Sequence, residues 1–214
     1  MISEITDEQR VERMRAELAY GFEALGGVRR GVALFGSART PPSDPVYELG
    51  VTVGRRLGEA GLSVITGGGP GLMAAANQGA REAGAHSIGL TIDLPHEQHE
   101  NPFLDLEVDF HYFFARKVMF VRYSSAFVGL PGGFGTMDEL FEVLTLVQTG
   151  KIRFFPVVLM GTEFWSGLVG WLRETMLARG NIDAEDLDIL HVTDDVDEVV
   201  AICTAAADRQ WSNA

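Results

Sequence analysis

A chain of 214 residues, 46% hydrophobic and 22% charged, has the composition of a globular protein, and its length suits one domain with a substantial core. The net charge of −13 argues against a general affinity for nucleic acid or anionic membranes, and no apolar run is long enough for a membrane span. Cys203 is the only cysteine, so no internal disulfide can form. Together with the charged, helix-patterned N-terminus, this predicts a cytoplasmic protein.

Helical and strand patterns alternate along the chain. In chain order we expect a helix at 7–25, a strand at 31–37, a helix at 44–60, a strand at 62–67, a helix at 70–83, strands at 86–92 and 106–111, a helix at 113–123, a strand at 125–130, a helix at 135–148, a strand at 155–160, a helix at 163–179, a strand at 189–192 and a helix at 195–209. Thr6 and Gln9 have the spacing of a capping box before the first helix.

The expected strands are apolar on both faces and are separated by helices. This pattern indicates a parallel sheet that is covered on both sides. The sequence therefore predicts an α/β fold: a doubly wound, Rossmann-like parallel sheet with helices on both faces. We expect one domain over 1–214, with an N-terminal helical segment at 1–28.

Three loops with unusual chemistry follow expected strands, at 36–39, 66–71 and 131–136. Ligands of doubly wound sheets bind beyond the carboxyl ends of the strands, where helix N-termini point. Glycine lets the backbone approach a ligand closely, and a helix N-terminus offers free N–H groups to a phosphate. The two glycine-rich loops each join an apolar strand to a helix, so together they favour a phosphate-bearing ligand.

Each glycine loop also has another interpretation. The segment 69–74 satisfies G-x-G-x-x-G/A, and Asp93 lies about where the ribose-binding acid of an NAD site would lie. Thr136 and Glu139 have the spacing of a capping box, as Thr6 and Gln9 do. Capping alone does not require three glycines and a proline before the helix.

Other polar clusters are weaker signals. Arg116, Lys117 and Arg122 form a local cationic segment that is either a solvated helix face or part of an anion site. The histidines and acids of 96–100 lack the H-E-x-x-H spacing, so we expect a solvated loop there and no metal. The sequence contains no G-x-S-x-G motif of a serine hydrolase.

The Arg116-Lys117 pair, the run P-G-G-F-G-T at 131–136 and Glu139 together resemble the LOG ("lonely guy") family of cytokinin riboside 5'-monophosphate phosphoribohydrolases. Members of this family are often labelled lysine decarboxylases. Gly36-Ser37, the loop at 66–73 and Thr145 support the likeness, which is clearest over 31–160. The run FEVLTLVQTGK resembles the type II branch, whose members are homodimers or larger assemblies.

The resemblance implies an enzyme that hydrolyses the N-glycosidic bond of an N6-modified adenosine 5'-monophosphate, and AMP is a plausible second substrate. The products would be the free base and ribose 5-phosphate. No metal or redox cofactor is required, and the partner is a small nucleoside monophosphate. The sequence names no acid that would protonate the departing purine.

The resemblance also implies roles for particular residues. Glu139 would stabilise the positive ribose or activate water, while Arg116 would orient the substrate. Further substrate-binding residues are expected to be Lys117, Gly132, Gly133, Gly135, Thr136, Thr145, Ser37, Gly68, Gly69, Gly71 and Asn77. Two alternatives stay open at this point: a broader nucleoside 5'-monophosphate nucleosidase, and a non-catalytic carrier of a nucleotide or of molybdopterin cofactor.

Overall fold

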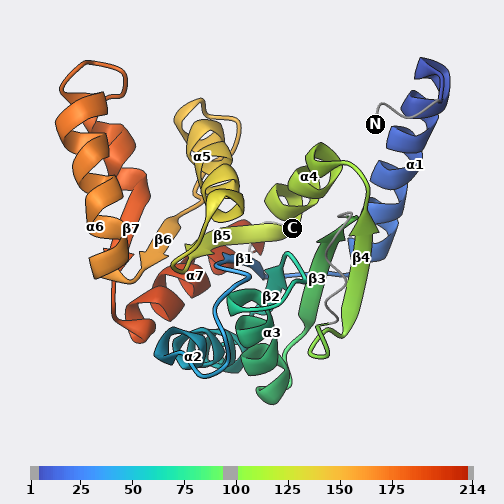
Figure 1. Ribbon diagram of the computed structural model, residues 1–214, viewed down its shortest axis with the longest axis horizontal. Coiled ribbons are helices and arrows are strands. Elements are labelled where there is room, and N and C mark those ends of the chain that lie inside the picture. Colours follow the sequence, from blue (N-terminus) through green and yellow to red (C-terminus); the bar gives the residue numbers. More distant parts are fainter. Residues whose placement is uncertain (1–4, 94–100, 212–214) are drawn as a thin grey trace.

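The structure, a computed structural model, describes residues 5–93 and 101–211 and contains a seven-stranded sheet flanked by helices (Figure 1). The strands are β1 Gly31–Phe35, β2 Ser63–Thr66, β3 Ser87–Ile92, β4 Leu106–Phe110, β5 Ser124–Gly129, β6 Val157–Met160 and β7 Leu190–Thr193. The α-helices are α1 Asp7–Leu25, α2 Pro45–Glu59, α3 Leu72–Glu82, α4 Phe113–Tyr123, α5 Phe134–Gln148, α6 Thr162–Trp171 and α7 Val196–Trp211.

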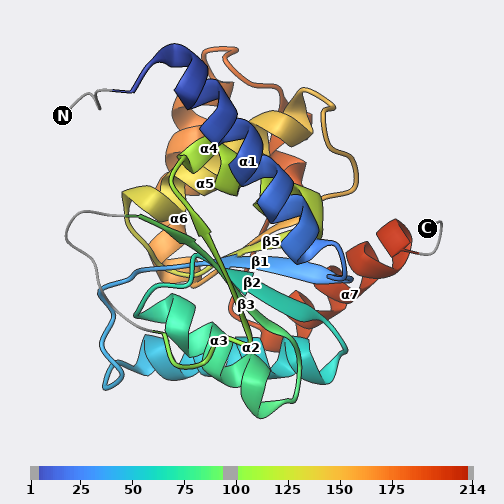
Figure 2. The ribbon, with the colours of Figure 1, turned by 90° about the vertical axis from the view of Figure 1, so that its right-hand side faces the viewer.

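The strand order is β4-β3-β2-β1-β5-β6-β7, and every neighbouring pair is parallel. The chain winds outward from β1 in one direction to β4 and then resumes at β5 on the other side of β1. The switch point of the sheet therefore lies between β1 and β5, where ligands bind in doubly wound folds. Figure 2 shows α2, α3 and α7 on one face of the sheet and α1, α4, α5 and α6 on the other. The predicted doubly wound α/β fold is confirmed.

Each face of the sheet contributes its own apolar core. Leu57 of α2 and Val64 of β2 belong to the core beneath α2, α3 and α7, and Phe127 of β5 and Trp165 of α6 belong to the opposite core. All four side chains are fully buried. Full burial of a side chain of this size contributes about 1.5–3 kcal/mol, so both helix layers are fixed to the sheet whose edge carries the site.

The predicted helices and strands are confirmed, with ends displaced by a few residues. The capping box of Thr6 and Gln9 is confirmed as well. The helix expected at 163–179 is α6 followed by a π-helical turn at Leu172–Leu177, and the short 3-10 helix at Ala184–Ile189 was not expected. Among the described residues, no helix is both long and apolar enough to cross a membrane.

Candidate functional site

The loops that follow β1, β2 and β5 meet at one edge of the sheet. The N–H of Ser37 donates to the carbonyl of Pro131 (3.0 Å), and the N–H of Leu72 donates to the carbonyl of Ser37 (2.9 Å). The loop after β1 is thereby bonded to both glycine loops. Together they border an open cleft of about 1980 Å³ at the switch point of the sheet.

The second glycine loop leads into α5, which begins earlier than its sequence suggested. Gly133 is the N-cap residue, and within the described chain no side chain caps this helix. The alternative that Thr136 caps α5 is therefore wrong: Thr136 is the third residue of the helix and is buried. The first residues of α5 border the cleft, and their N–H groups lack a side-chain cap in the described structure. A helix terminus with this geometry can bind an anion.

The glycines of this loop have different structural reasons. A Cβ on Gly132 would lie 2.1 Å from Thr136 Oγ1, so this position is closed to any side chain. A Cβ on Gly133 or Gly135 would meet no described atom within 4 Å, so these two glycines leave open space at the helix terminus. Packing explains Gly132, whereas the open space at Gly133 and Gly135 suits the close approach of a ligand.

The first glycine loop is held by its own tight contacts. Gly68 has φ +71°, and its N–H donates to Thr66 Oγ1 (3.0 Å). Gly71 has φ +67°, and a Cβ there would lie 2.2 Å from the carbonyl oxygen of Ser37. Gly71 therefore allows the two loops to touch and does not border the cleft, whereas Gly68 and Gly69 do.

Asn77 lies beneath this loop and does not line the cleft, contrary to expectation. Its Oδ1 accepts from Thr66 Oγ1 (2.6 Å) and from Asn101 Nδ2 (3.0 Å), and its Nδ2 donates to Ser87 Oγ (2.8 Å). Asn101 Nδ2 also reaches the carbonyl of Gly69 (3.4 Å). The amide of Asn77 is therefore occupied in supporting the loop.

Arg116 and Glu139 form a buried ion pair at the floor of the cleft. Arg116 Nη2 lies 3.5 Å from Glu139 Oε1, and the two side chains are 12% and 5% exposed. The guanidinium also lies over the rings of Phe113 and Phe120, at 5.2 and 5.7 Å. Its Nη1 is 3.8 Å from the place where a Cβ on Gly67 would lie. Arg116 thus lies between the first glycine loop and Glu139, the carboxylate that follows the second glycine loop.

Burial shifts the pKa values of both members of this pair. Burial raises the pKa of Glu139 to about 7, although Arg116 and Lys117 favour the charged carboxylate. Burial also lowers the pKa of Arg116. Among the described residues, Arg116 Nε has no hydrogen-bond partner. A carboxyl group that titrates near neutral pH in a cleft is typical of catalytic sites.

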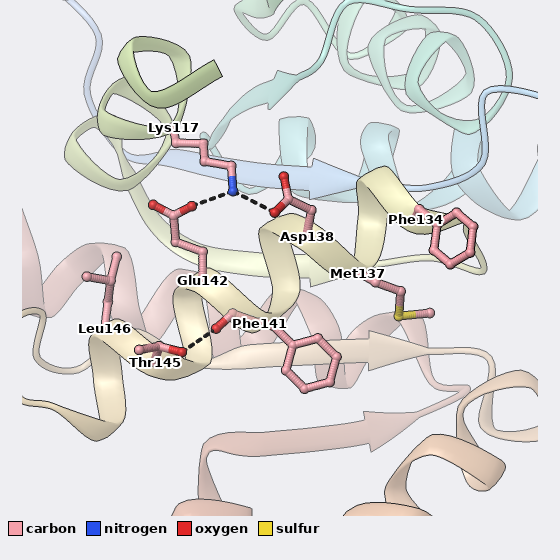
Figure 3. Close-up of a pocket in the computed structure, with 8 residues that line it drawn as sticks. All are labelled: Lys117, Phe134, Met137, Asp138, Phe141, Glu142, Thr145 and Leu146. Carbon is pink, nitrogen blue, oxygen red and sulfur yellow. Dashed lines mark hydrogen bonds and ion pairs between the residues drawn. The ribbon is translucent and has the colours of Figure 1, made fainter. Parts of the chain in front are cut away.

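Lys117 and Thr145 do not line this cleft. They border a separate pocket of about 500 Å³ on another face of α5. Figure 3 shows Lys117 Nζ between Asp138 and Glu142, at 2.8 and 2.6 Å. Burial lowers the pKa of Lys117, but its hydrogen bonds to these two carboxylates outweigh burial and raise it. The hydroxyl of Thr145 donates to the carbonyl of Phe141 (2.7 Å).

The structure brings most of the expected site residues into one cleft. Those that line it are Ser37, Gly68, Gly69, Arg116, Gly132, Gly133, Gly135, Thr136 and Glu139. Those expected in the site that lie elsewhere are Gly71, Asn77, Lys117 and Thr145.

The cleft also contains residues that the sequence did not single out. Arg13 and Glu17 of α1 line it. No local motif marks them, because they reach the cleft only through the fold. Asp93, the acid of the NAD alternative, is exposed at the cleft and lies 3.6 Å from His111 Nδ1.

The described residues, 5–93 and 101–211, include histidine, cysteine, aspartate and glutamate side chains that could ligate a metal ion. Within these ranges, no three histidine, cysteine, aspartate or glutamate residues are grouped to hold a metal ion. The cluster at 96–100, expected to be a solvated loop, lies outside the described residues.

Comparison with known proteins places this chain in a family. The model of the family described as "possible lysine decarboxylase" matches residues 73–203. The chain is 30% identical to the cytokinin riboside 5'-monophosphate phosphoribohydrolase of Mycobacterium marinum over 168 residues, which cover 78% of this chain and 89% of that protein. It is 28% identical to the probable cytokinin riboside 5'-monophosphate phosphoribohydrolase LOG4 of Oryza sativa subsp. japonica over 186 residues, which cover 85% and 79% of the two chains.

Solved structures share the fold. The X-ray structure of TM1055, a structural genomics target, has a TM-score of 0.61 at 28% identity and covers 80% of this chain and 96% of its own. A molybdenum cofactor carrier protein from Chlamydomonas reinhardtii has a TM-score of 0.62 at 23% identity and covers 83% and 98%. The second likeness shows a common fold alone. The family match and the coverage of the mycobacterial relative show that the chain belongs to the LOG family.

Proposed function

We propose that this protein hydrolyses the N-glycosidic bond of purine nucleoside 5'-monophosphates, releasing the free base and ribose 5-phosphate. Its substrates are cytokinin riboside 5'-monophosphates and AMP. The observation that carries the proposal is the buried pair of Glu139 and Arg116, which lies in the same cleft as the uncapped N-terminus of α5. The names of the relatives point to the same reaction.

The 5'-phosphate binds at the start of α5. The N–H groups of Gly133, Gly135 and Thr136 provide hydrogen-bond donors, and the partial positive charge of the helix terminus attracts the anion. Gly133 and Gly135 leave the space that close approach requires. Gly68, Gly69 and Ser37 also line the cleft, and they contact the ribose.

Glu139 acts at the sugar. Cleavage of an N-glycosidic bond develops positive charge on the ribose, which a nearby carboxylate stabilises. Glu139 therefore works as the anion, or it accepts a proton from the attacking water. A pKa of about 7 leaves a large fraction of Glu139 ionised at neutral pH while keeping it basic enough to accept a proton. Arg116 keeps this carboxylate oriented and contacts the substrate.

A comparison of nucleotides with nucleosides tests the proposal. Isopentenyladenosine monophosphate, AMP and their dephosphorylated forms are incubated with the protein, and free base and ribose 5-phosphate are quantified by chromatography. We expect equimolar products from both nucleotides and at least about 100-fold slower release from the nucleosides, because the phosphate donors of α5 are then unused.

Two outcomes would contradict the proposal in different ways. Equal rates with nucleosides would refute the phosphate site at α5. Tight binding of AMP without release of base would favour the non-catalytic carrier and remove the catalytic role of Glu139. The relative rates with the two nucleotides decide between a cytokinin-producing enzyme and a broader nucleosidase.

A further inference from the structure

The N-terminal helix α1 braces α4, the helix that carries Arg116. A Cβ on Gly21 of α1 would lie 2.9 Å from Met119 Cε of α4, so the two helices approach closely there. At the end of α4, the hydroxyl of Tyr123 donates to the carbonyl of Phe22 (3.2 Å). Figure 2 shows α1 crossing over α4. Helix α1 lies outside the residues that the family model matches, whereas α4 lies inside them.

At the start of α4 the contact between the helices is polar and has two hydrogen bonds. The N–H of His111 donates to Glu17 Oε1 (2.7 Å), and the N–H of Tyr112 donates to Glu17 Oε2 (3.1 Å). Tyr112 is the N-cap residue of α4, and its own side chain makes no cap bond to the described chain. A carboxylate from a helix 94 residues away in sequence therefore serves as the anion at this terminus.

The carbonyl of the N-cap residue Tyr112 bonds to the first turn of α4, which contains Arg116. The carbonyl of Tyr112 accepts from the N–H of Ala115 (3.1 Å) and from the N–H of Arg116 (3.3 Å). Residue 112 is thus held by Glu17 through its N–H and starts the turn of Arg116 through its carbonyl. The guanidinium at the end of this chain of contacts lies 3.5 Å from Glu139.

We infer that Glu17 is a positioning residue for the reaction proposed above: it fixes the first turn of α4 so that Arg116 faces Glu139 in the cleft. It also occupies the positive terminus of α4, whereas, in the described residues, the α5 terminus in the same cleft has no side-chain cap. The substrate phosphate is thereby directed to α5. The expected effect of Glu17 on kinetics rests on the proposed function. The contact of Glu17 with the start of α4 rests on the structure alone.

Three variants test this inference. Glu17→Ala removes both acceptors, and Glu17→Gln keeps one acceptor oxygen but loses the charge. The matched control is Glu12→Ala on the same helix, whose carboxylate bonds only to Arg15 in the described structure and is largely exposed. Two quantities are measured at a temperature where all variants are folded: hydrogen exchange of the amides at 111–116 without ligand, and kcat and KM for base release.

For Glu17→Ala we expect exchange at 111–116 to rise about tenfold and kcat to fall about tenfold, with KM changed less than about threefold, since a misplaced catalytic group mainly slows the chemical step. Glu17→Gln should recover part of both losses, and Glu12→Ala should match the wild type. A merely structural role of Glu17 would lower stability without this selective loss of kcat.

The inference is overturned if exchange at 111–116 is the same in Glu17→Ala and Glu12→Ala. It is also overturned if exchange rises while kcat and KM stay unchanged. A wild-type protein that binds AMP but releases no base would refute the proposed function alone. Exchange at 111–116 would then still decide whether Glu17 holds α4, and AMP affinity would decide whether Arg116 depends on that contact.

Discussion

Replacing Glu139 by glutamine should change the stability of the protein in a pH-dependent way. The free energy of unfolding of Glu139→Gln minus that of the wild type should be larger at alkaline pH than at acidic pH. Burial raises the pKa of Glu139 from 4.5 to about 7 in the folded state. The folded protein therefore holds a proton on this group more tightly than the unfolded chain does. The stability that this proton contributes is fully present below pH 4.5 and is lost as the pH rises through 7.

The magnitude follows from the two pKa values. Between pH 5 and pH 8, ionisation of Glu139 should lower the free energy of unfolding of the wild type by about 2.5 kcal/mol, since one pKa unit corresponds to about 1.36 kcal/mol. Glutamine resembles the protonated carboxyl and does not titrate. Any effect of the substitution that does not depend on pH, such as a change in packing, cancels when the two pH values are compared. The attraction between ionised Glu139 and Arg116 is already included in the pKa of about 7.

The assay is urea-induced unfolding of the wild type and Glu139→Gln at pH 5, 6, 7 and 8. The variant at the exposed Glu163, Glu163→Gln, controls for the loss of one negative charge from a chain of net charge −13. Parallel pH profiles for the wild type and Glu139→Gln would contradict this prediction, because they would mean that folding leaves the pKa of this carboxyl unchanged.

Further predictions concern other residues of the cleft, of the glycine loops and of the core. Arg116→Lys should lower kcat/KM for base release about 100-fold in steady-state assays, because an ammonium group lacks the planar guanidinium that lies over two aromatic rings. Gly132→Ala should destabilise the fold by about 1–3 kcal/mol, because the new methyl group would clash with the hydroxyl of Thr136. Gly135→Ala should leave the stability of the protein unchanged and weaken AMP binding about tenfold, as measured by calorimetry. Asn77→Ala should cost about 3 kcal/mol in denaturant unfolding, because it leaves buried hydrogen-bonding groups unpaired. Burial raises the pKa of the Cys203 thiol to about 12, so native protein should resist a thiol reagent that labels the unfolded chain at pH 8.

The sequence predicted the fold well because its signals are local. Apolar strands, helical periodicity and glycine-rich junctions lie in contiguous segments, and each specifies its own element before any packing is known. The pairing of Arg116 with the second glycine loop came from a family signature that spans only the residues 116 to 139. These signals located the floor of the cleft and the start of α5.

Some residues expected in the site lie outside the cleft because of the direction of their side chains. Successive residues of an α-helix are turned by about 100°. Arg116 and Lys117 are therefore adjacent in α4 but contact different sides of the neighbouring helix α5. Asn77 is polar and lies near a glycine loop, yet it hydrogen-bonds beneath that loop. Thr145 bonds to its own helix. A motif gives the position of a residue in sequence but not the partner that its side chain meets.

The contribution of α1 could not be predicted, because the strands β1 to β4 separate Glu17 from the start of α4 in sequence. Only the folded chain brings the two together. No periodicity or spacing connects residues that are 94 positions apart. The expected homodimer or larger assembly likewise stays a prediction. Light scattering on the eluting protein should give at least twice the mass of one chain, and the mass of a single chain would contradict it.

The proposed role of Glu139 is to perform the cleavage in a cleft that binds the nucleotide through other residues. The most direct test is single-turnover release of base from isopentenyladenosine monophosphate, with excess wild-type protein or excess Glu139→Gln, and with binding measured in parallel. If Glu139 has this role, both proteins should bind the nucleotide within about tenfold of each other, and release by the variant should be at least about 1000-fold slower. Release by the variant at a rate close to that of the wild type would exclude this role of Glu139.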